Sequence, residues 1–370
     1  MAEKIKHFLK NDTVLAISGI LAVISCVLVP PDAEYAGYIN LHTILTLFCL
    51  MAVMAGMQSL GLFQMIGEGL LRKISSARGL VLVLVFLCFA SSMFITNDVA
   101  LITFVPLAIL VLKMAKLEAS MSFTITFMTI AANLGSMLTP VGNPQNLYLY
   151  SISGMSIGSF LLLMLPYTLL AALLLIAGIL FKCKNSSVTV SLKEEREPLN
   201  RTKLIYYFIL FVLCLGCVAG FLSVKGLFVI VVIAVFIENK KLLLKVDYSL
   251  LLTFICFFIF IGNMGRFSAF RDFIIGILDG HERLVSIGIS QVISNVPAAL
   301  LLSGFTSKWS ELIIGTNLGG LGTLIASMAS LISYKQVAQN YPESKMKYLI
   351  TFPIWNFVFL VVMVTVSMIL

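Results

Sequence analysis

Charged side chains are scarce in this chain. Only 11% of its 370 residues are Asp, Glu, Lys or Arg, whereas 60% are hydrophobic and the mean hydropathy is +1.05. Soluble domains carry about 25% charged residues, so this chain cannot cover a water-exposed surface. Apolar runs long enough to cross a bilayer recur from one end to the other. The composition predicts an all-α, multi-pass membrane protein.

Catalytic and nucleotide-binding motifs are also missing from the sequence. It holds no His-Glu-x-x-His, no Gly-x-Ser-x-Gly and no phosphate-binding Gly-x-x-x-x-Gly-Lys-Ser/Thr. The three histidines, His7, His42 and His281, are far apart, and the seven cysteines fall mostly inside apolar runs, where they suit packing. We therefore expect no enzyme, no metal-ligating His/Cys centre, no organic cofactor and no requirement for an ATPase partner.

Basic residues outnumber acidic ones, and the net charge is +8. They fall in short clusters between apolar runs, as the positive-inside rule describes, and form no basic stripe with interleaved aromatics that would suit nucleic acid. Lys4, Lys6 and Lys10 predict a cytoplasmic N-terminus. The expected location of the chain is the cell membrane.

The charge pattern predicts a sequence of membrane segments. Segment 79–112 has basic residues beyond both ends and a polar interruption at Thr96-Asn97-Asp98, which predicts a re-entrant helical hairpin. A second hairpin is expected at 284–306. The remaining predicted segments are 13–30, 41–70, 119–150, 155–181, 204–220, 223–238, 249–272, 311–334 and 348–370.

A polar sequence motif occurs twice in this largely apolar chain. Ser92-x-x-x-Thr96-Asn97 returns as Ser290-x-x-x-Ser294-Asn295, and an Asn-Leu-Gly follows each copy, ending at Gly135 and Gly319. The topology makes the two copies run in opposite directions, as in inverted-repeat secondary transporters. The predicted repeats are 1–181 and 223–370, and 182–222 is a cytoplasmic linker with a connecting helix.

The hairpin tips are the predicted binding site. Their helix N-termini suit an anion, whereas the oxygens of Ser92, Thr96 and Asn97, repeated by Ser290, Ser294 and Asn295, suit a small cation. Ser92 lies four residues before Thr96, so both oxygens are expected on one helix face. The alternative is that these residues only cap helices.

The partner segments 119–150 and 311–334 are predicted to be broken helices. The first contains Pro140, Gly142, Asn143 and Pro144. The second contains Thr316, Asn317 and Gly319, and its Gly315-x-x-x-Gly319 spacing is equally explained by close helix packing.

Asp98 is the one carboxylate predicted deep in the membrane. An acid in such a place is costly, and it is by default a candidate for binding a proton or a coupling cation.

These residues resemble a known superfamily. Thr96-Asn97-Asp98, the segment from Asn133 to Asn146 and Gly315-to-Gly320 look like the group of arsenite permeases, sodium/proton antiporters, citrate transporters and divalent-anion/sodium symporters. The resemblance implies two scaffold-plus-hairpin repeats, a homodimer, an elevator-like movement and no cofactor. The dicarboxylate symporters of this group read Ser-Asn-Thr at each tip. Both tips here lack the final Thr, so the resemblance is closer to the arsenite permeases.

The resemblance also assigns positions. Sodium sites would combine Ser92, Thr96 and Asn97 with Gly135 or Gly142, and Ser290, Ser294 and Asn295 with Gly319 or Gly320. Substrate would contact residues of the tips and of the broken helices, namely Thr96, Asn97, Asp98, Asn143, Ser294, Asn295, Thr316 and Asn317.

The leading hypothesis is an ion-coupled transporter, driven by sodium or protons, of a small anion such as a carboxylate or an arsenite-like species. The alternative is a cation/proton antiporter centred on Asp98. A passive channel also fits the static pattern.

Overall fold

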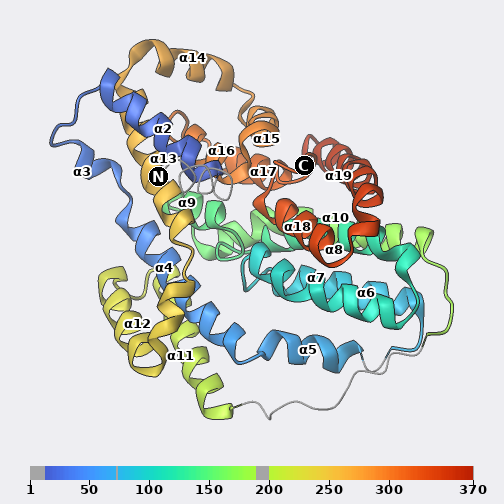
Figure 1. Cartoon of the computed structure of the whole chain (residues 1–370). Coiled ribbons are helices and arrows are strands. Elements are labelled where there is room, and N and C mark those ends of the chain that lie inside the picture. The colour runs from blue at the N-terminus through green and yellow to red at the C-terminus, as the bar shows by residue number, and fades with distance from the viewer. Residues whose placement is uncertain (1–12, 72–73, 189–199, 370) are drawn as a thin grey trace, which may run out of the picture.

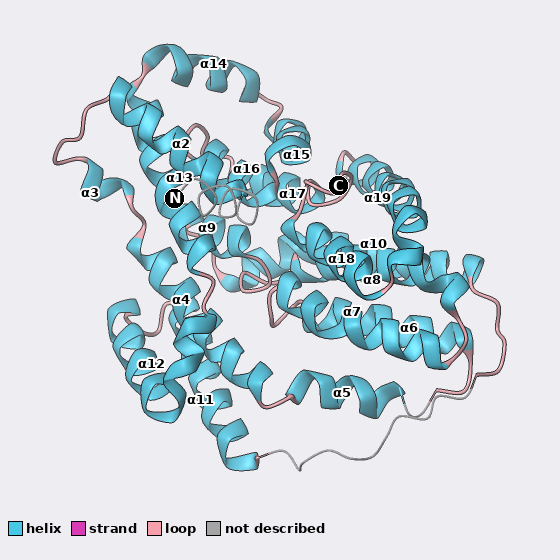
Figure 2. Cartoon of the chain, in the orientation of Figure 1, coloured by secondary structure: helices cyan, strands magenta, loops and turns pink. Residues whose placement is uncertain are grey.

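The computed structural model describes residues 13–71, 74–188 and 200–369, and over these ranges it consists of helices and loops without a β-strand (Figures 1 and 2). Lys4, Lys6 and Lys10, on which the orientation of the N-terminus was predicted, lie outside the described residues, as do positions 189–199 of the predicted linker.

Six helices are long and apolar enough to cross a membrane among the described residues. They are Leu41–Ser59, Asn97–Met114, Ile157–Lys182, Arg201–Val218, Tyr248–Arg266 and Pro342–Ser367. The multi-pass membrane class predicted from composition is therefore confirmed at this level.

The first half of the chain contains the elements from Thr13 to Lys182. They are α2 (Thr13–Leu28), α3 (Tyr35–Tyr38), α4 (Leu41–Ser59), α5 (Leu62–Leu71), α6 (Ala77–Ser91), α7 (Asn97–Met114), the short 3₁₀ turn η1 (Glu118–Ser120), α8 (Met121–Ser136), α9 (Pro144–Ser153) and α10 (Ile157–Lys182).

The second half begins with two connecting helices and then follows the same order. Its elements are α11 (Arg201–Val218), α12 (Val224–Asn239), η2 (Lys240–Lys245), α13 (Tyr248–Arg266), α14 (Ser268–Leu278), α15 (Glu282–Ile293), α16 (Asn295–Ser303), α17 (Trp309–Leu318), α18 (Met328–Asn340), η3 (Pro342–Ser344) and α19 (Lys345–Ser367).

Two predicted membrane segments are not single helices, and the prediction of one continuous segment is wrong for each. The segment predicted at 41–70 is broken into α4 and α5, because Gly61 takes a left-handed φ of 72° that ends the helix. The segment predicted at 249–272 is broken at Phe267, whose extended backbone separates α13 from α14. In both halves a long helix is thus followed by a short one before the hairpin begins.

The hairpins and broken helices pack around a shared core. In Figure 1, α6 and α7 lie side by side, and α8 packs against both of them. Every residue of α8 is buried, so this helix lies at the centre of the body. In the second half α17 packs against α15 and α16 in the corresponding way.

Helices from the two halves also interlock. The second arm of the first hairpin, α7, packs against α18 of the other half, and α16 packs against α9. At the periphery α4 packs against α11 and α12, whereas α13 packs against α2. Tyr207 of α11 lies so close to α4 that a Cβ added at Gly56 would collide with its ring. This close approach fixes the connecting helices to α4.

Candidate functional site

The tip of the first hairpin is tied to the break between α8 and α9. Thr96 is the N-cap of α7 but makes no capping side-chain bond. The Asn97 backbone N–H donates to the Gly142 carbonyl at 3.3 Å, and the Asn97 amide donates to Asn133 Oδ1 at 2.9 Å. The polar groups of the tip therefore bind a partner segment and do more than cap α7.

The second tip repeats this arrangement. Ser294 is the single residue between α15 and α16, and its φ of 76° is a left-handed value that is unusual for serine. The Asn295 N–H donates to the Ala326 carbonyl at 3.0 Å, just before α18 begins. The Ser294 hydroxyl lies 3.4 Å from both Asn295 Oδ1 and the Ala326 carbonyl.

One detail of the predicted tip geometry is wrong. Ser92 and Thr96 do not share a helix face, because Ser92 is the C-cap of α6 and Thr96 is the N-cap of α7. Likewise Ser290 lies within α15, whereas Ser294 is the turn residue that ends it. The chain reverses direction between α6 and α7 and between α15 and α16, so the helix is interrupted at these positions. Ser92 and Ser290 each donate to a carbonyl of their own helix, at 3.0 and 2.6 Å.

Glycines bring each hairpin arm against its broken helix. A Cβ at Gly135 would collide with the Phe89 carbonyl and lie 2.7 Å from Ser92 Oγ. A Cβ at Gly319 would lie 2.7 Å from Ser290 Oγ. The structure thus places Ser92 with Gly135 and Ser290 with Gly319, the pairings predicted for the two coupling-ion positions.

Gly142 and Gly320, the remaining two predicted glycines, lie in the broken segments and contact the tips. The Gly142 carbonyl accepts from Asn97, and a Cβ at Gly320 would lie 3.0 Å from the Asn295 amide nitrogen.

Buried asparagines join the two halves across the core. Asn133 donates to the Gly320 carbonyl at 3.3 Å and accepts from Ser327 Oγ at 3.0 Å. Asn317 donates to Asn146 Oδ1 at 2.6 Å. Both broken helices are therefore connected to each other as well as to their own hairpins.

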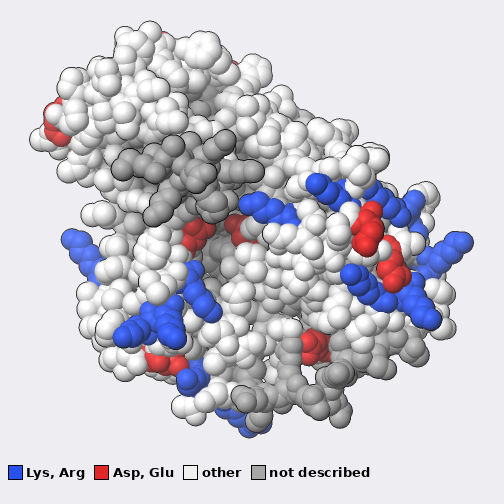
Figure 3. All heavy atoms as spheres, viewed as in Figure 1, with Lys and Arg blue, Asp and Glu red and all other residues white. Residues whose placement is uncertain are grey.

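A cavity of about 390 Å³ opens beside the first tip. Its walls come from α4, the tip of hairpin 1, the start of α9, the η2–α13 corner and α18. Figure 3 shows acidic atoms around a hollow near the middle of one face, with basic side chains on neighbouring parts of the surface. The polar side chains that line the cavity are Gln58, Thr96, Asp98, Asn143, Lys245 and Asp247.

Asp98 is the most exceptional group in this cavity. It lies in the first turn of α7, and its Oδ1 is buried without a hydrogen-bond partner among the described residues. A buried carboxylate oxygen without a partner is costly, and a proton, a cation, a donor on the substrate or a water molecule in the cavity can each supply one.

The predicted substrate residues divide into two groups. Thr96, Asp98 and Asn143 line the cavity, and Asn97 lies beside them within the tip. Ser294, Asn295, Thr316 and Asn317 are buried and are not part of the cavity lining.

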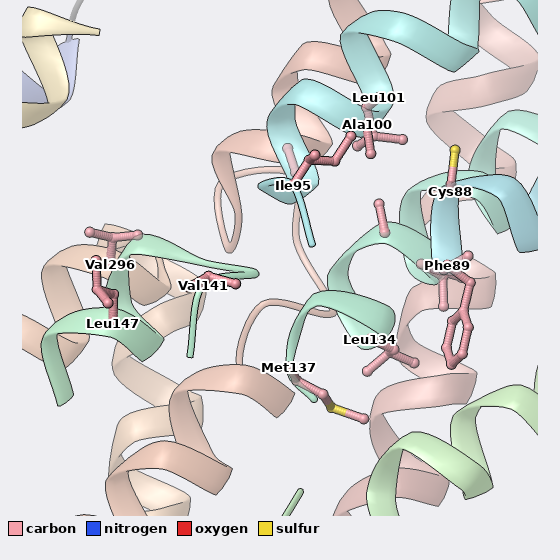
Figure 4. Packing of buried hydrophobic residues seen from close by; sticks show 14 of the residues in the cluster. Cys88, Phe89, Ile95, Ala100, Leu101, Leu134, Met137, Val141, Leu147 and Val296 are labelled. Atoms are coloured by element: carbon pink, nitrogen blue, oxygen red, sulfur yellow. The ribbon is translucent and has the colours of Figure 1, made fainter. Parts of the chain in front are cut away.

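The second tip is instead packed against the first half. Val296 of α16 lies beside Leu147 of α9 among buried apolar residues (Figure 4). Thr316 donates to its own helix at Leu312, 2.7 Å away.

Three polar residues of the cavity were not predicted. Gln58 directly follows Met57, where a second repeated stretch ends: Leu45-Thr46 through Cys49 to Met57 resembles Leu252-Thr253 through Cys256 to Met264. This repeat could have drawn attention to Gln58. Lys245 and Asp247 lie between the predicted membrane segments 223–238 and 249–272, in a stretch whose basic residues predict only a cytoplasmic loop. Their place in the cavity depends on packing between distant segments, and no local signal indicates it.

The described residues contain no group of three or more His, Cys, Asp or Glu side chains arranged to hold a metal ion. The oxygens at the tips are hydroxyls, amides and carbonyls, which are suitable ligands for a hard monovalent cation.

Comparison with known proteins agrees with this architecture. The profile of the citrate transporter family matches residues 2–306. The chain is 31% identical over 318 residues to an uncharacterized transporter of Methanocaldococcus jannaschii, covering 86% of each chain. It is 32% identical over 308 residues to the inner membrane protein YbiR of Escherichia coli K12, covering 80% of each.

A shorter similarity links the chain to a plant protein. It is 33% identical over 152 residues to a silicon efflux transporter of Oryza sativa, covering 41% of this chain and 30% of that protein. The matching family and two of these three relatives are named as transporters, and the chain is not an enzyme. Given the match over most of its length, the chain belongs to the citrate transporter family.

Proposed function

We propose that this protein is a secondary transporter that moves a small anion across the cell membrane, coupled to protons or sodium. The anion is a carboxylate or an arsenite-like inorganic species. The observation that carries the proposal is the 390 Å³ cavity, where the N-termini of α7 and α9 meet at Thr96 and Asn143. Two helix N-termini supply partial positive charge to an anion.

Asp98 provides the coupling. An anion and the Asp98 carboxylate in one cavity repel each other by on the order of 3 kcal/mol, for charges about 5 Å apart at an effective dielectric of about 20. A proton or sodium ion on Asp98 removes that repulsion. The affinities for anion and coupling ion are then linked, and each raises the other by the same factor.

The coupling-ion positions are the two tips. We assign sodium, where it is used, to Ser92, Thr96 and Asn97 with Gly135 or Gly142, and to the matching set of Ser290, Ser294, Asn295 and Gly319. In support, Gly135 lies against Ser92 and Gly319 against Ser290.

The proposed transport cycle uses the two halves as inverted repeats of 1–181 and 223–370. Supporting this, the order of long helix, short helix, hairpin and broken helix is the same in both halves. The hairpins are proposed to be re-entrant, the protein to be a homodimer with a cytoplasmic N-terminus, and the hairpin body to move as an elevator. Ser294, Asn295, Thr316 and Asn317 would then contact substrate in the opposite position of this body.

A second candidate function is cation/proton antiport without an anion. The favouring observation is the presence of two carboxylates, Asp98 and Asp247, on the same cavity. Two acids in one cavity attract cations and protons competitively.

The test uses purified protein in proteoliposomes with labelled citrate and, separately, labelled arsenite. We expect a proton or sodium gradient to drive accumulation in the parent. Asp98→Asn, which resembles the protonated acid, is expected to abolish gradient-driven accumulation but to retain exchange of internal for external anion. Asp272→Asn, on the exposed side of α14, is the matched control.

The antiport alternative gives a different result in the same vesicles. It predicts a cation-driven internal pH change in the parent without uptake of either anion, and loss of that change in Asp98→Asn. Full gradient-driven accumulation by Asp98→Asn would contradict both functions.

A further inference from the structure

A second cavity of about 350 Å³ lies next to the substrate cavity. It is formed by the corner between α4 and α5 and by the outer part of α7. Gln58 and Ile102 line both cavities, so these two residues form the shared wall. A hydrogen bond crosses between the same helices beside that wall, from Gln58 Nε2 to Thr103 Oγ1 at 3.3 Å.

The chemistry of the second cavity differs from that of the first. Its lining contains no charged residue; the polar members are Gln58, Gln64 and Thr103. The substrate cavity instead has Lys245, an exposed cation at its edge. The carboxylates Asp98 and Asp247 line that same cavity. An anion leaving water needs a counter-charge, which Lys245 supplies at the substrate cavity and no residue of the second cavity supplies. A cation is attracted toward Asp98 and needs only oxygens on the way.

The sequence of α7 supplies such an oxygen. Pro106 has no N–H, so the Ile102 carbonyl lacks the donor that would bond it four residues later in a regular helix. Ile102 and Pro106 both line the second cavity. Asp98 and Ile102 are four residues apart on one face of α7. The Asp98 face of α7 thus carries Ile102, whose carbonyl Pro106 leaves without its usual donor. The next residue, Thr103, adds a hydroxyl that donates to the Val99 carbonyl at 2.8 Å and accepts from Gln58.

We propose that the second cavity is a separate access path for the coupling ion, proton or sodium, to Asp98, and that Gln58 and Thr103 form its threshold. The anion uses the Lys245 side of the substrate cavity. This inference rests on the proposed coupling role of Asp98. It adds that the ion and the anion reach the site by different routes.

The first test separates coupling from anion binding. In proteoliposomes with labelled citrate, Gln58→Leu and Thr103→Val are expected to lower accumulation driven by a proton or sodium gradient. Loss of a single polar contact on the path corresponds to about fivefold, from roughly 1 kcal/mol. In Thr103→Val, exchange of internal for external citrate without a gradient is expected to stay within about twofold, because Thr103 lines only the second cavity and Lys245 and the tip are intact.

Controls make the assignment specific. Gln64→Leu removes an amide from the exposed part of the same cavity, away from the shared wall, and is expected to retain coupling. Thr103→Ser keeps the hydroxyl and is expected to restore it. Equal loss of exchange and accumulation in Thr103→Val would overturn the separate path, as would a loss of coupling in Gln64→Leu as large as that in Thr103→Val. If Asp98→Asn still couples, the proposed function itself fails, whatever the Gln58 result.

The second test does not depend on the transported anion. The thiol introduced by Thr103→Cys is treated with a cationic and an anionic methanethiosulfonate reagent, and modification at that site is followed by mass spectrometry. After correction for the intrinsic rates on a small thiol, the cationic reagent is expected to react about tenfold faster, as a potential worth about 1.4 kcal/mol requires. Equal rates, or a faster anionic reagent, would overturn the cation path.

Discussion

Replacement of Asn133 tests the polar connection between the two halves. Its side chain makes three buried hydrogen bonds, with Asn97 at 2.9 Å, Ser327 at 3.0 Å and the Gly320 carbonyl at 3.3 Å. Hydrogen bonds between membrane helices average about 0.6 kcal/mol each, so the three together contribute roughly 2 kcal/mol. Asn133→Ala also leaves the Asn97 amide and the Ser327 hydroxyl buried without this partner, which adds about 1–3 kcal/mol.

Asn356 is the matched control for this substitution. It too is fully buried in a helix, but its amide donates only to the Phe352 carbonyl of its own helix, and its Oδ1 has no partner. Asn356→Ala removes the same volume and leaves no side-chain group orphaned. The free energy of unfolding is therefore expected to fall by about 2–4 kcal/mol more for Asn133→Ala than for Asn356→Ala.

The measurement is equilibrium unfolding by SDS titration in mixed detergent micelles, with helix content as the signal. Because both variants lose the same atoms, their difference isolates the hydrogen bonds from the cavity term. Equal losses would refute the reasoning, since the network would then contribute no more than packing does.

Two further predictions concern close packing and pH. Gly135→Ala is expected to lower unfolding stability by about 1–3 kcal/mol, because its Cβ would collide with the Phe89 backbone. Gly19→Ala, which has open space around it within a helix, is expected to be neutral or stabilising in the same SDS titration. The hydrogen bond from Arg266 holds the pKa of Asp32 below its ordinary value of 3.8. A lowered folded-state pKa stabilises above that ordinary value, and the stabilisation is lost as the pH falls through the folded-state pKa. Melting temperatures of the parent and Asp32→Asn should therefore differ at pH 6 and converge only below the lowered folded-state pKa, and a difference that persists below that pKa would contradict the assignment.

Local sequence signals predicted the hairpin tips well because tips are made of short polar phrases. Thr96-Asn97 and Ser294-Asn295 each begin a helix, and each contacts the break of its partner segment. The pairing of Ser92 with Gly135 also follows from local pattern, because glycine permits the close approach that the repeat implies.

Features that depend on distant packing could not be predicted in the same way. Gly61 is one of many glycines in apolar runs, and nothing near it in the sequence distinguishes a glycine that ends a helix from one that packs inside it. Lys245 and Asp247 reach the cavity only because the η2–α13 corner packs against α4, so that it lines the same cavity as the tip of hairpin 1. Charge patterning assigns such residues to a membrane face and not to a cavity.

The distribution of hydrogen bonds bears on which parts of the protein can move together. The hairpin tips and broken helices are joined by buried bonds, among them Asn97–Asn133 and Asn317–Asn146. By contrast, α4 is joined to this body by only partly buried bonds, Gln58–Thr103 on α7 and a hydroxyl contact between Thr43 and Ser151 on α9.

Buried bonds are costly to break without replacement, whereas water replaces partly exposed ones with little loss. Most of the remaining wall that α4 gives to the cavity is apolar, with Met51, Met54 and Ala55 among its residues. Sliding along such a wall exchanges one set of dispersion contacts for another. A body held together by its buried asparagines and bordered by an apolar wall is therefore the unit expected to move in the proposed elevator step. The Gln58–Thr103 and Thr43–Ser151 bonds are the contacts with α4 that such a movement is expected to break.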